Sequence, residues 1–180
     1  MNRALRVLFI ASLVVSCAPS GDDPLSRLDT WEAPTGDYRI RYLAPPWAII
    51  EEDLDGARFQ IESTLMASGR IDGGVGKYEL QTSRVPRSVE AEMDREVRAS
   101  RGVAGRSIEE GPRAITTHEG IEGLELITFD VPDPFERYRR VVLFPLGASQ
   151  TLRLDFDATP DLDSDEVTEM IRLVGIGPAS

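Results

Sequence analysis

The sequence contains one cysteine, Cys17, and one histidine, His118, among its 180 residues. A single cysteine excludes an internal disulfide framework, so the fold must be held together by burial of apolar side chains. A single histidine removes most catalytic sites, because a Ser-His-acid triad would have to use His118 and no Gly-x-Ser-x-Gly elbow accompanies it. A zinc site of the usual kind also lacks ligands, so no metal site is predicted. We expect residues 116–120 to form a polar turn that holds His118 in solvent.

Basic residues are also scarce, and Lys77 is the only lysine. The chain has 20 basic and 31 acidic side chains, a formal net charge of −11. That acidity excludes nucleic acid as a partner and argues against electrostatic binding to anionic headgroups. Lys77 follows a glycine-rich stretch, but Ile71 replaces the first glycine of a phosphate-binding loop and Tyr78 replaces its Ser or Thr. We therefore interpret residues 67–76 as a mobile loop.

Long apolar runs are absent as well. A membrane-spanning helix needs about 20 apolar residues, whereas the apolar stretch near the start covers only residues 7–15. Two arginines precede this stretch and small residues follow it, an order typical of a secretory signal. The stretch ends in Val14-Val15-Ser16-Cys17, which resembles the lipobox of bacterial prolipoproteins. The resemblance implies that residues 1–16 are a signal peptide and that Cys17 is the lipid attachment site.

The covalent lipid on Cys17 would be the only cofactor and the link to a membrane. Each buried methylene contributes about 0.8 kcal/mol, so several long acyl chains hold a protein on a bilayer almost permanently. Loss of residues 1–16 removes two arginines and takes the net charge from −11 to −13, so the membrane contact is expected from acyl chains. Ala18, not an aspartate, follows the cysteine, which by resemblance to lipoproteins of two-membrane bacteria implies the outer membrane of the cell envelope. The alternatives are a membrane anchor and a secretory signal cut elsewhere.

Beyond the cysteine the sequence divides into three parts. Residues 17–36 are rich in Pro, Gly, Ser and Asp and predict a lipidated flexible tether, in which Trp31 either docks on the domain or reaches the headgroups. Residues 37–176 predict one domain of about 140 residues, large enough for a single core. Residues 177–180 are a short C-terminal tail.

Alternation of apolar and polar residues predicts several strands in the domain. These lie at 38–42, 77–83, 123–131, 135–144 and 151–158, with a hairpin of 48–52 and 58–63 and a weaker strand at 106–115. Gly56, in the turn of that hairpin, is expected to need a positive φ.

A spacing of four residues predicts a helix between the two runs of strands. Val89, Met93 and Val97 follow Ser88, a suitable N-cap, and Gly102 ends the pattern. A second helix is expected from residue 163 or 164, with Glu166 in a capping box. The order of elements predicts an α+β fold, a single domain with a largely antiparallel sheet covered by helices.

The two ends of the domain resemble the PsbP/Mog1-like superfamily. The first strand leads to Ala44-Pro45-Pro46-Trp47, and the strand at 151–158 is followed by Pro160 and a last helix. This resemblance spans about residues 37–176 and implies an antiparallel sheet between helices. It also implies a non-enzymatic role in assembling or stabilising a partner complex. No metal or partner-binding residue of the family can be matched here.

One aromatic and basic cluster interrupts the acidic sequence and is a candidate partner-binding surface. It consists of Phe135, Arg137, Tyr138, Arg139 and Arg140. Arginines next to aromatic rings are suited to stacking and to bidentate contacts with a partner. The alternative is that these arginines pair across the sheet with Asp155 or Asp157, which we otherwise expect in solvent.

The sequence therefore favours a lipid-anchored envelope protein that acts as a non-enzymatic binding or assembly module for another envelope protein. The first alternative is a metal-independent hydrolase of envelope polymers. The second is a carrier of an apolar ligand, which requires a cavity of roughly 300 Å³ or more between sheet and helices.

Overall fold

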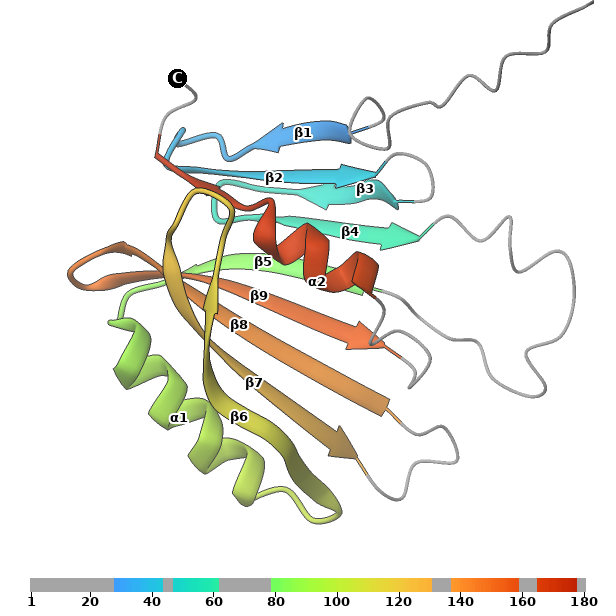
Figure 1. Cartoon of the computed structure of the whole chain (residues 1–180), viewed down its shortest axis with the longest axis vertical. Helices are drawn as coiled ribbons and strands as arrows, with labels where there is room; N and C mark the ends of the chain where they lie inside the picture. The colour runs from blue at the N-terminus through green and yellow to red at the C-terminus, as the bar shows by residue number, and fades with distance from the viewer. Residues whose placement is uncertain (1–27, 44–46, 62–78, 131–136, 159–164, 178–180) are drawn as a thin grey trace, which may run out of the picture.

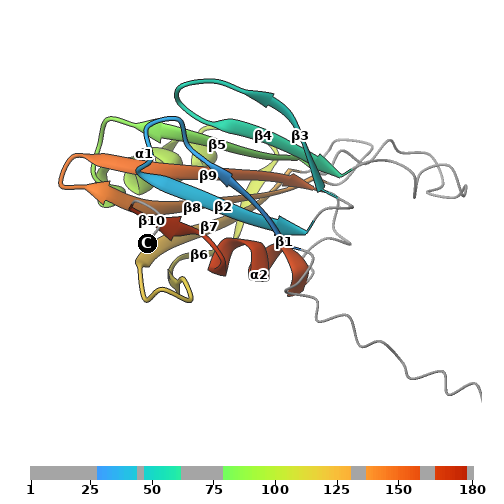
Figure 2. The same cartoon turned by 90° about the horizontal axis from the view of Figure 1, so that it is seen from above.

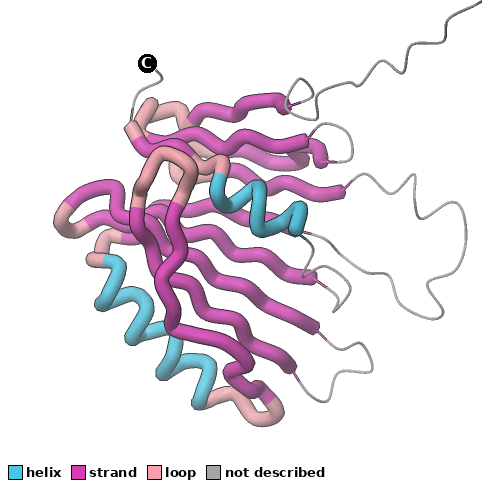
Figure 3. The backbone as a smooth tube through the Cα atoms, in the orientation of Figure 1, coloured by secondary structure: helices cyan, strands magenta, loops and turns pink. Residues whose placement is uncertain are grey.

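The computed structural model describes residues 28–43, 47–61, 79–130, 137–158 and 165–177 (Figure 1). Within these ranges the chain forms ten strands and two helices (Figure 3). The expected mobile loop at 67–76 and the corner at 44–46 lie outside them. Residues 1–27, with the predicted signal peptide and Cys17, also lie outside the described part.

The strands form two sheets in which every described pairing is antiparallel. The larger sheet has seven strands in the order β3-β4-β5-β9-β8-β7-β6, and the smaller has the order β1-β2-β10. The bounds of the strands are β1 Leu28–Glu32, β2 Tyr38–Leu43, β3 Trp47–Glu52, β4 Ala57–Ile61, β5 Glu79–Val85, β6 Arg106–Thr116, β7 Glu122–Asp130, β8 Arg137–Gly147, β9 Gln150–Ala158 and β10 Gly175–Ile176.

The alternating patterns predicted the strands of the larger sheet. The expected hairpin is β3 paired with β4, and β6 to β9 follow one another as antiparallel neighbours. The expectation for the first turn is wrong, because Gly56 does not have a positive φ. A Cβ atom on Gly56 would instead lie 2.0 Å from the backbone oxygen of Thr82. Glycine is needed there because two strands approach closely, not because of the turn geometry.

The predicted boundary between tether and domain is wrong. Residues 28–32 form β1, which pairs with β2 along its whole length. Trp31 is only 6% exposed, and its ring centroid lies 5.6 Å from that of Tyr38 and 6.1 Å from that of Phe59. Burial of this large aromatic surface stabilises a strand that has few other apolar residues. The folded part therefore begins by residue 28 rather than at residue 37.

The prediction of a sheet covered by helices is also wrong. The protein is mostly antiparallel β-sheet, and one face of the larger sheet packs against the smaller sheet as well as against a helix (Figure 2). Tyr42 of β2 and Phe59 of β4 meet in this core with ring centroids 5.2 Å apart. The reason is that residues 28–32 and 175–176 add strands to β2, so a second sheet covers the apolar face that helices were expected to cover.

The two helices lie on opposite faces of the larger sheet. Helix α1, Val89–Arg101, begins at the predicted N-cap Ser88, whose side chain accepts from the backbone N of Ala91, and ends at Gly102. It packs on Leu126, Val141 and Leu143. Helix α2, Asp165–Arg172, buries Val167, Met170 and Ile171 in the core of the other face, as predicted. The side chain of Glu166 lies outside the described part. None of the helices in the described ranges is long and apolar enough to cross a membrane.

Candidate functional site

A buried glutamate organises the part of the larger sheet next to α2. Glu125, on β7, is 1% exposed. Arg140 on β8 and Arg113 on β6 each donate from Nε to one of its carboxylate oxygens, and the Arg113 bond is 2.6 Å long. A buried carboxylate is tolerated only when such charged donors replace the lost water. Three neighbouring strands thus hold one negative charge between two guanidinium groups.

An irregular register aligns Arg113 with Glu125. The pairing of β6 with β7 shifts on both sides of Glu110, after which Arg113 stands opposite Glu125. Gly111, inside the irregular stretch, has φ 96, and a Cβ atom there would lie 2.4 Å from the backbone oxygen of Glu125. Both the left-handed conformation and the close approach require glycine at this position.

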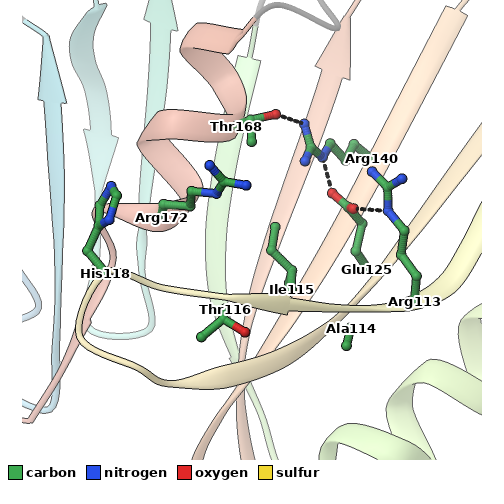
Figure 4. Close-up of a pocket in the computed structure, with 9 residues that line it drawn as sticks. All are labelled: Arg113, Ala114, Ile115, Thr116, His118, Glu125, Arg140, Thr168 and Arg172. Carbon is green, nitrogen blue, oxygen red and sulfur yellow. Dashed lines mark hydrogen bonds and ion pairs between the residues drawn. The ribbon is translucent and has the colours of Figure 1, made fainter.

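A pocket of about 660 Å³ opens beside this cluster, between β6 and α2 (Figure 4). Arg140 links the sheet to the helix, because its NH1 donates to Oγ1 of Thr168 at 2.9 Å. The pocket is lined by Arg113, Ala114, Ile115, Thr116, His118, Glu125, Arg140, Thr168 and Arg172.

The turn that contains His118 closes one end of the pocket. His118 lies in a turn after β6, as the sequence predicted. Its backbone N donates to the backbone oxygen of Arg172 at 2.8 Å, and its Nε2 lies 2.7 Å from Oε1 of Glu169. These contacts join the turn after β6 to the last turn of α2. They therefore hold the C-terminal end of α2 at the edge of the pocket.

The pocket is chemically suited to binding an anion. Guanidinium groups bind carboxylates and phosphates through paired N–H donors. Among the described residues that line it there is neither serine nor cysteine, and the hydroxyl of Thr168 accepts from Arg140 rather than facing a base. Nowhere in the described ranges do three or more His, Cys, Asp or Glu side chains form a group that could hold a metal ion.

The structure does not bring the predicted partner-binding residues together. Arg139 and Arg140 point to opposite faces of the larger sheet, because Arg139 contacts Glu96 of α1 and Arg140 contacts Thr168 of α2. Tyr138 packs against Phe129, with ring centroids 5.2 Å apart. Phe135 and the side chain of Arg137 lie outside the described part, as does Cys17.

The alternative of cross-strand pairing is confirmed for one arginine of that cluster. NH2 of Arg139 lies 2.7 Å from Oδ1 of Asp155 on β9. The expectation that Asp155 is solvated is therefore wrong.

A second network of buried charges lies under α1. Glu92 and Glu96 of α1 are 0% and 3% exposed, and Arg153 of β9 reaches them at 2.9 Å and 2.8 Å. Burial raises the pKa of Glu92, but hydrogen bonds from Arg95 and the charges of Arg95, Arg153 and Arg87 outweigh it and hold the pKa below the ordinary value of 4.5. Every acid in this network has an arginine partner, so its role is to fasten α1 to the sheet.

The sequence patterns did not predict the pocket, although one signal was present. Glu125 falls between Gly123 and Ile127 on the same face of the predicted strand, where Ile127 indicates burial. A charge at such a position predicts a counterion on a neighbouring strand. The identity of that counterion depends on register, which the pattern does not supply.

Comparison with solved structures supports a PsbP-like fold for the chain. It is similar to the solution structure of cyanobacterial PsbP (CyanoP) from Synechocystis, with a TM-score of 0.55 and 13% identity over 91% of this chain and 98% of that one. This likeness supports the PsbP-like fold within the expected resemblance.

A second similar structure is a crystal structure from Bacteroides thetaiotaomicron, with a TM-score of 0.50 and 9% identity. The match covers 83% of this chain and 48% of that one, so this chain spans about half the length of that protein. No family model matches the sequence. No curated protein matches it either. At these identities the likeness shows the fold alone.

Proposed function

We propose that this protein is a lipid-anchored component of the bacterial cell envelope whose domain acts as a non-enzymatic binding or assembly module for another envelope protein. The observation that carries the proposal is the sequence Val14-Val15-Ser16-Cys17 behind a short basic and apolar segment. Acylation of Cys17 would hold an acidic domain at the membrane without a basic surface. Ala18 after the cysteine favours the outer membrane.

The geometry of the domain supports binding rather than catalysis. Both carboxylate oxygens of Glu125 accept from arginines, so this acid is not placed to exchange protons with a substrate. The pocket therefore does not support the hydrolase alternative. The charged residues that line the pocket also do not suit the apolar ligand of a carrier.

The anchor is tested by a Cys17→Ser variant expressed in the native host. We expect the wild-type protein in the membrane fraction, releasable only by detergent, and the variant in the soluble fraction. Mass spectrometry of the mature N-terminus should find acyl chains on the wild-type protein alone. Ser20→Ala, a nearby change that keeps the thiol, is the matched control. Retention of Cys17→Ser in the membrane as strongly as the wild type would contradict the proposal.

The partner is tested by crosslinking in intact cells followed by mass spectrometry. A reproducible envelope protein should be recovered with the wild type and lost with Cys17→Ser, because the variant no longer shares the membrane surface. Recovery of the same neighbours from both proteins would show that the anchor does not place the domain beside its partner.

A further inference from the structure

We propose that the pocket between β6 and α2 binds a small organic monocarboxylate, with Arg172 as its principal cation. This inference deepens the proposed binding function by naming the chemical class of a ligand. Three features of the pocket support it: the free donors of Arg172, the distribution of charge around the pocket, and an apolar side chain inside it.

The guanidinium of Arg172 has N–H donors that are available to a ligand. It is exposed in the last turn of α2, and within the part of the chain that the structure describes its guanidinium makes no hydrogen bond or ion pair. The other two arginines of the pocket both donate to Glu125. In the close-up the guanidinium of Arg172 lies between His118 and Arg140 (Figure 4). A carboxylate that enters the pocket could therefore bind the Arg172 guanidinium without breaking any ion pair that Arg172 makes with the described residues.

The balance of charge favours a single negative charge. Among the described residues, Glu125 accepts from Arg113 and Arg140, and Glu110 also pairs with Arg113. Glu169 lies against His118. Within the described part, Arg172 is thus the arginine of the pocket with no acid beside it. One carboxylate matches the single positive charge of Arg172, whereas a phosphate dianion would leave an excess of negative charge in a confined site.

The pocket also has an apolar contact beside the cations. Ile115 points into it from β6 (Figure 4) and belongs to the buried core. Thr168, on the same helix as Arg172, supplies a hydroxyl. A carboxylate with a short apolar body would therefore satisfy Arg172 and cover Ile115 at the same time.

The test is a titration of the purified full chain, in detergent micelles, with sodium butyrate at constant ionic strength. Binding is followed by NMR of the arginine Nε–H groups. Butyramide, which has the same shape without the charge, and inorganic phosphate are titrated in parallel. We expect saturable shifts with butyrate, weaker binding of phosphate and none of butyramide.

Variants of Arg172 test whether butyrate binds in this pocket. Arg172→Gln should weaken butyrate binding by about tenfold or more, because a charge-assisted pair of hydrogen bonds is lost. Arg172→Lys, which keeps the charge but not the paired donors, should bind with intermediate affinity. Arg101→Gln, which changes an exposed arginine in the last turn of α1, is the matched control and should bind as the wild type does. Urea unfolding of each variant confirms that the fold is retained.

Several results would overturn the inference. They are an absence of saturable butyrate shifts, equal binding of butyramide, tighter binding of phosphate, or an Arg172→Gln protein that binds like the wild type. Each leaves the result for Cys17→Ser unchanged, so failure of the ligand assignment is separable from failure of the anchor.

Discussion

Removal of the Arg153 guanidinium tests how far the buried network under α1 stabilises the fold. Arg153 is 7% exposed. It reaches three acids: Glu92 at 2.9 Å, Glu96 at 2.8 Å and Asp155 at 2.5 Å. The substitution Arg153→Met keeps a long unbranched side chain but deletes all these contacts, so it isolates the charge from the volume.

The expected loss of stability depends on which ion pairs the three acids keep after the substitution. Breaking a buried ion pair by removing one partner costs about 3–5 kcal/mol. Arg95 still contacts Glu92, and Arg139 still contacts Glu96 and Asp155, so the lower end of that range applies. We expect Arg153→Met to lower the free energy of unfolding by about 3 kcal/mol, and the melting midpoint by about 6–12 °C for a domain of this size.

The assay is urea unfolding at pH 7 followed by tryptophan fluorescence. Trp31 and Trp47 are 6% and 3% exposed, so both report the loss of the core. Arg101→Met, at an exposed position of α1, is the control and should change stability by less than about 0.5 kcal/mol. The double variant Glu92→Met, Arg153→Met should be more stable than the two single losses predict, since it removes charge from both sides of the pair. A loss below about 1 kcal/mol for Arg153→Met would refute the reasoning.

Much of the fold was predictable because the spacing of apolar residues reflects the local preference of each segment for strand or helix. The strands of the larger sheet alternate, and α1 has a cap at Ser88 and apolar residues four apart. The strand β1 was missed because only Trp31 of its five residues is buried, which leaves no alternation to detect. Its stability comes from pairing with β2 and from contacts with Phe59, which is distant in sequence.

The pocket was not predictable to the same degree, because its residues come from three strands and a helix. A two-residue period already separates Arg139 from Arg140, so their assignment to one surface conflicted with the strand predicted there. The pairing of Arg113 with Glu125 depends on a shift of register at Glu110, which no periodicity encodes. The position of Arg172 depends in turn on how α2 docks against the sheet.

Two further predictions test the buried charges and the close approach of strands. Because the folded pKa of Glu92 lies below the usual 4.5, its contribution to stability is present above that pH and is lost as the pH falls toward the folded value. Urea unfolding between pH 7 and pH 3 should therefore show a decline that is smaller in Glu92→Gln, and an equal decline in both proteins would contradict the assignment. Gly56→Ala should lower the free energy of unfolding by about 1–3 kcal/mol or more, because its Cβ would lie 2.0 Å from the rigid backbone oxygen of Thr82. Gly147→Ala is the matched control, since a Cβ there meets no atom within 4 Å. Equal urea midpoints for these two variants would mean that β3, β4 and β5 can separate at this turn without cost.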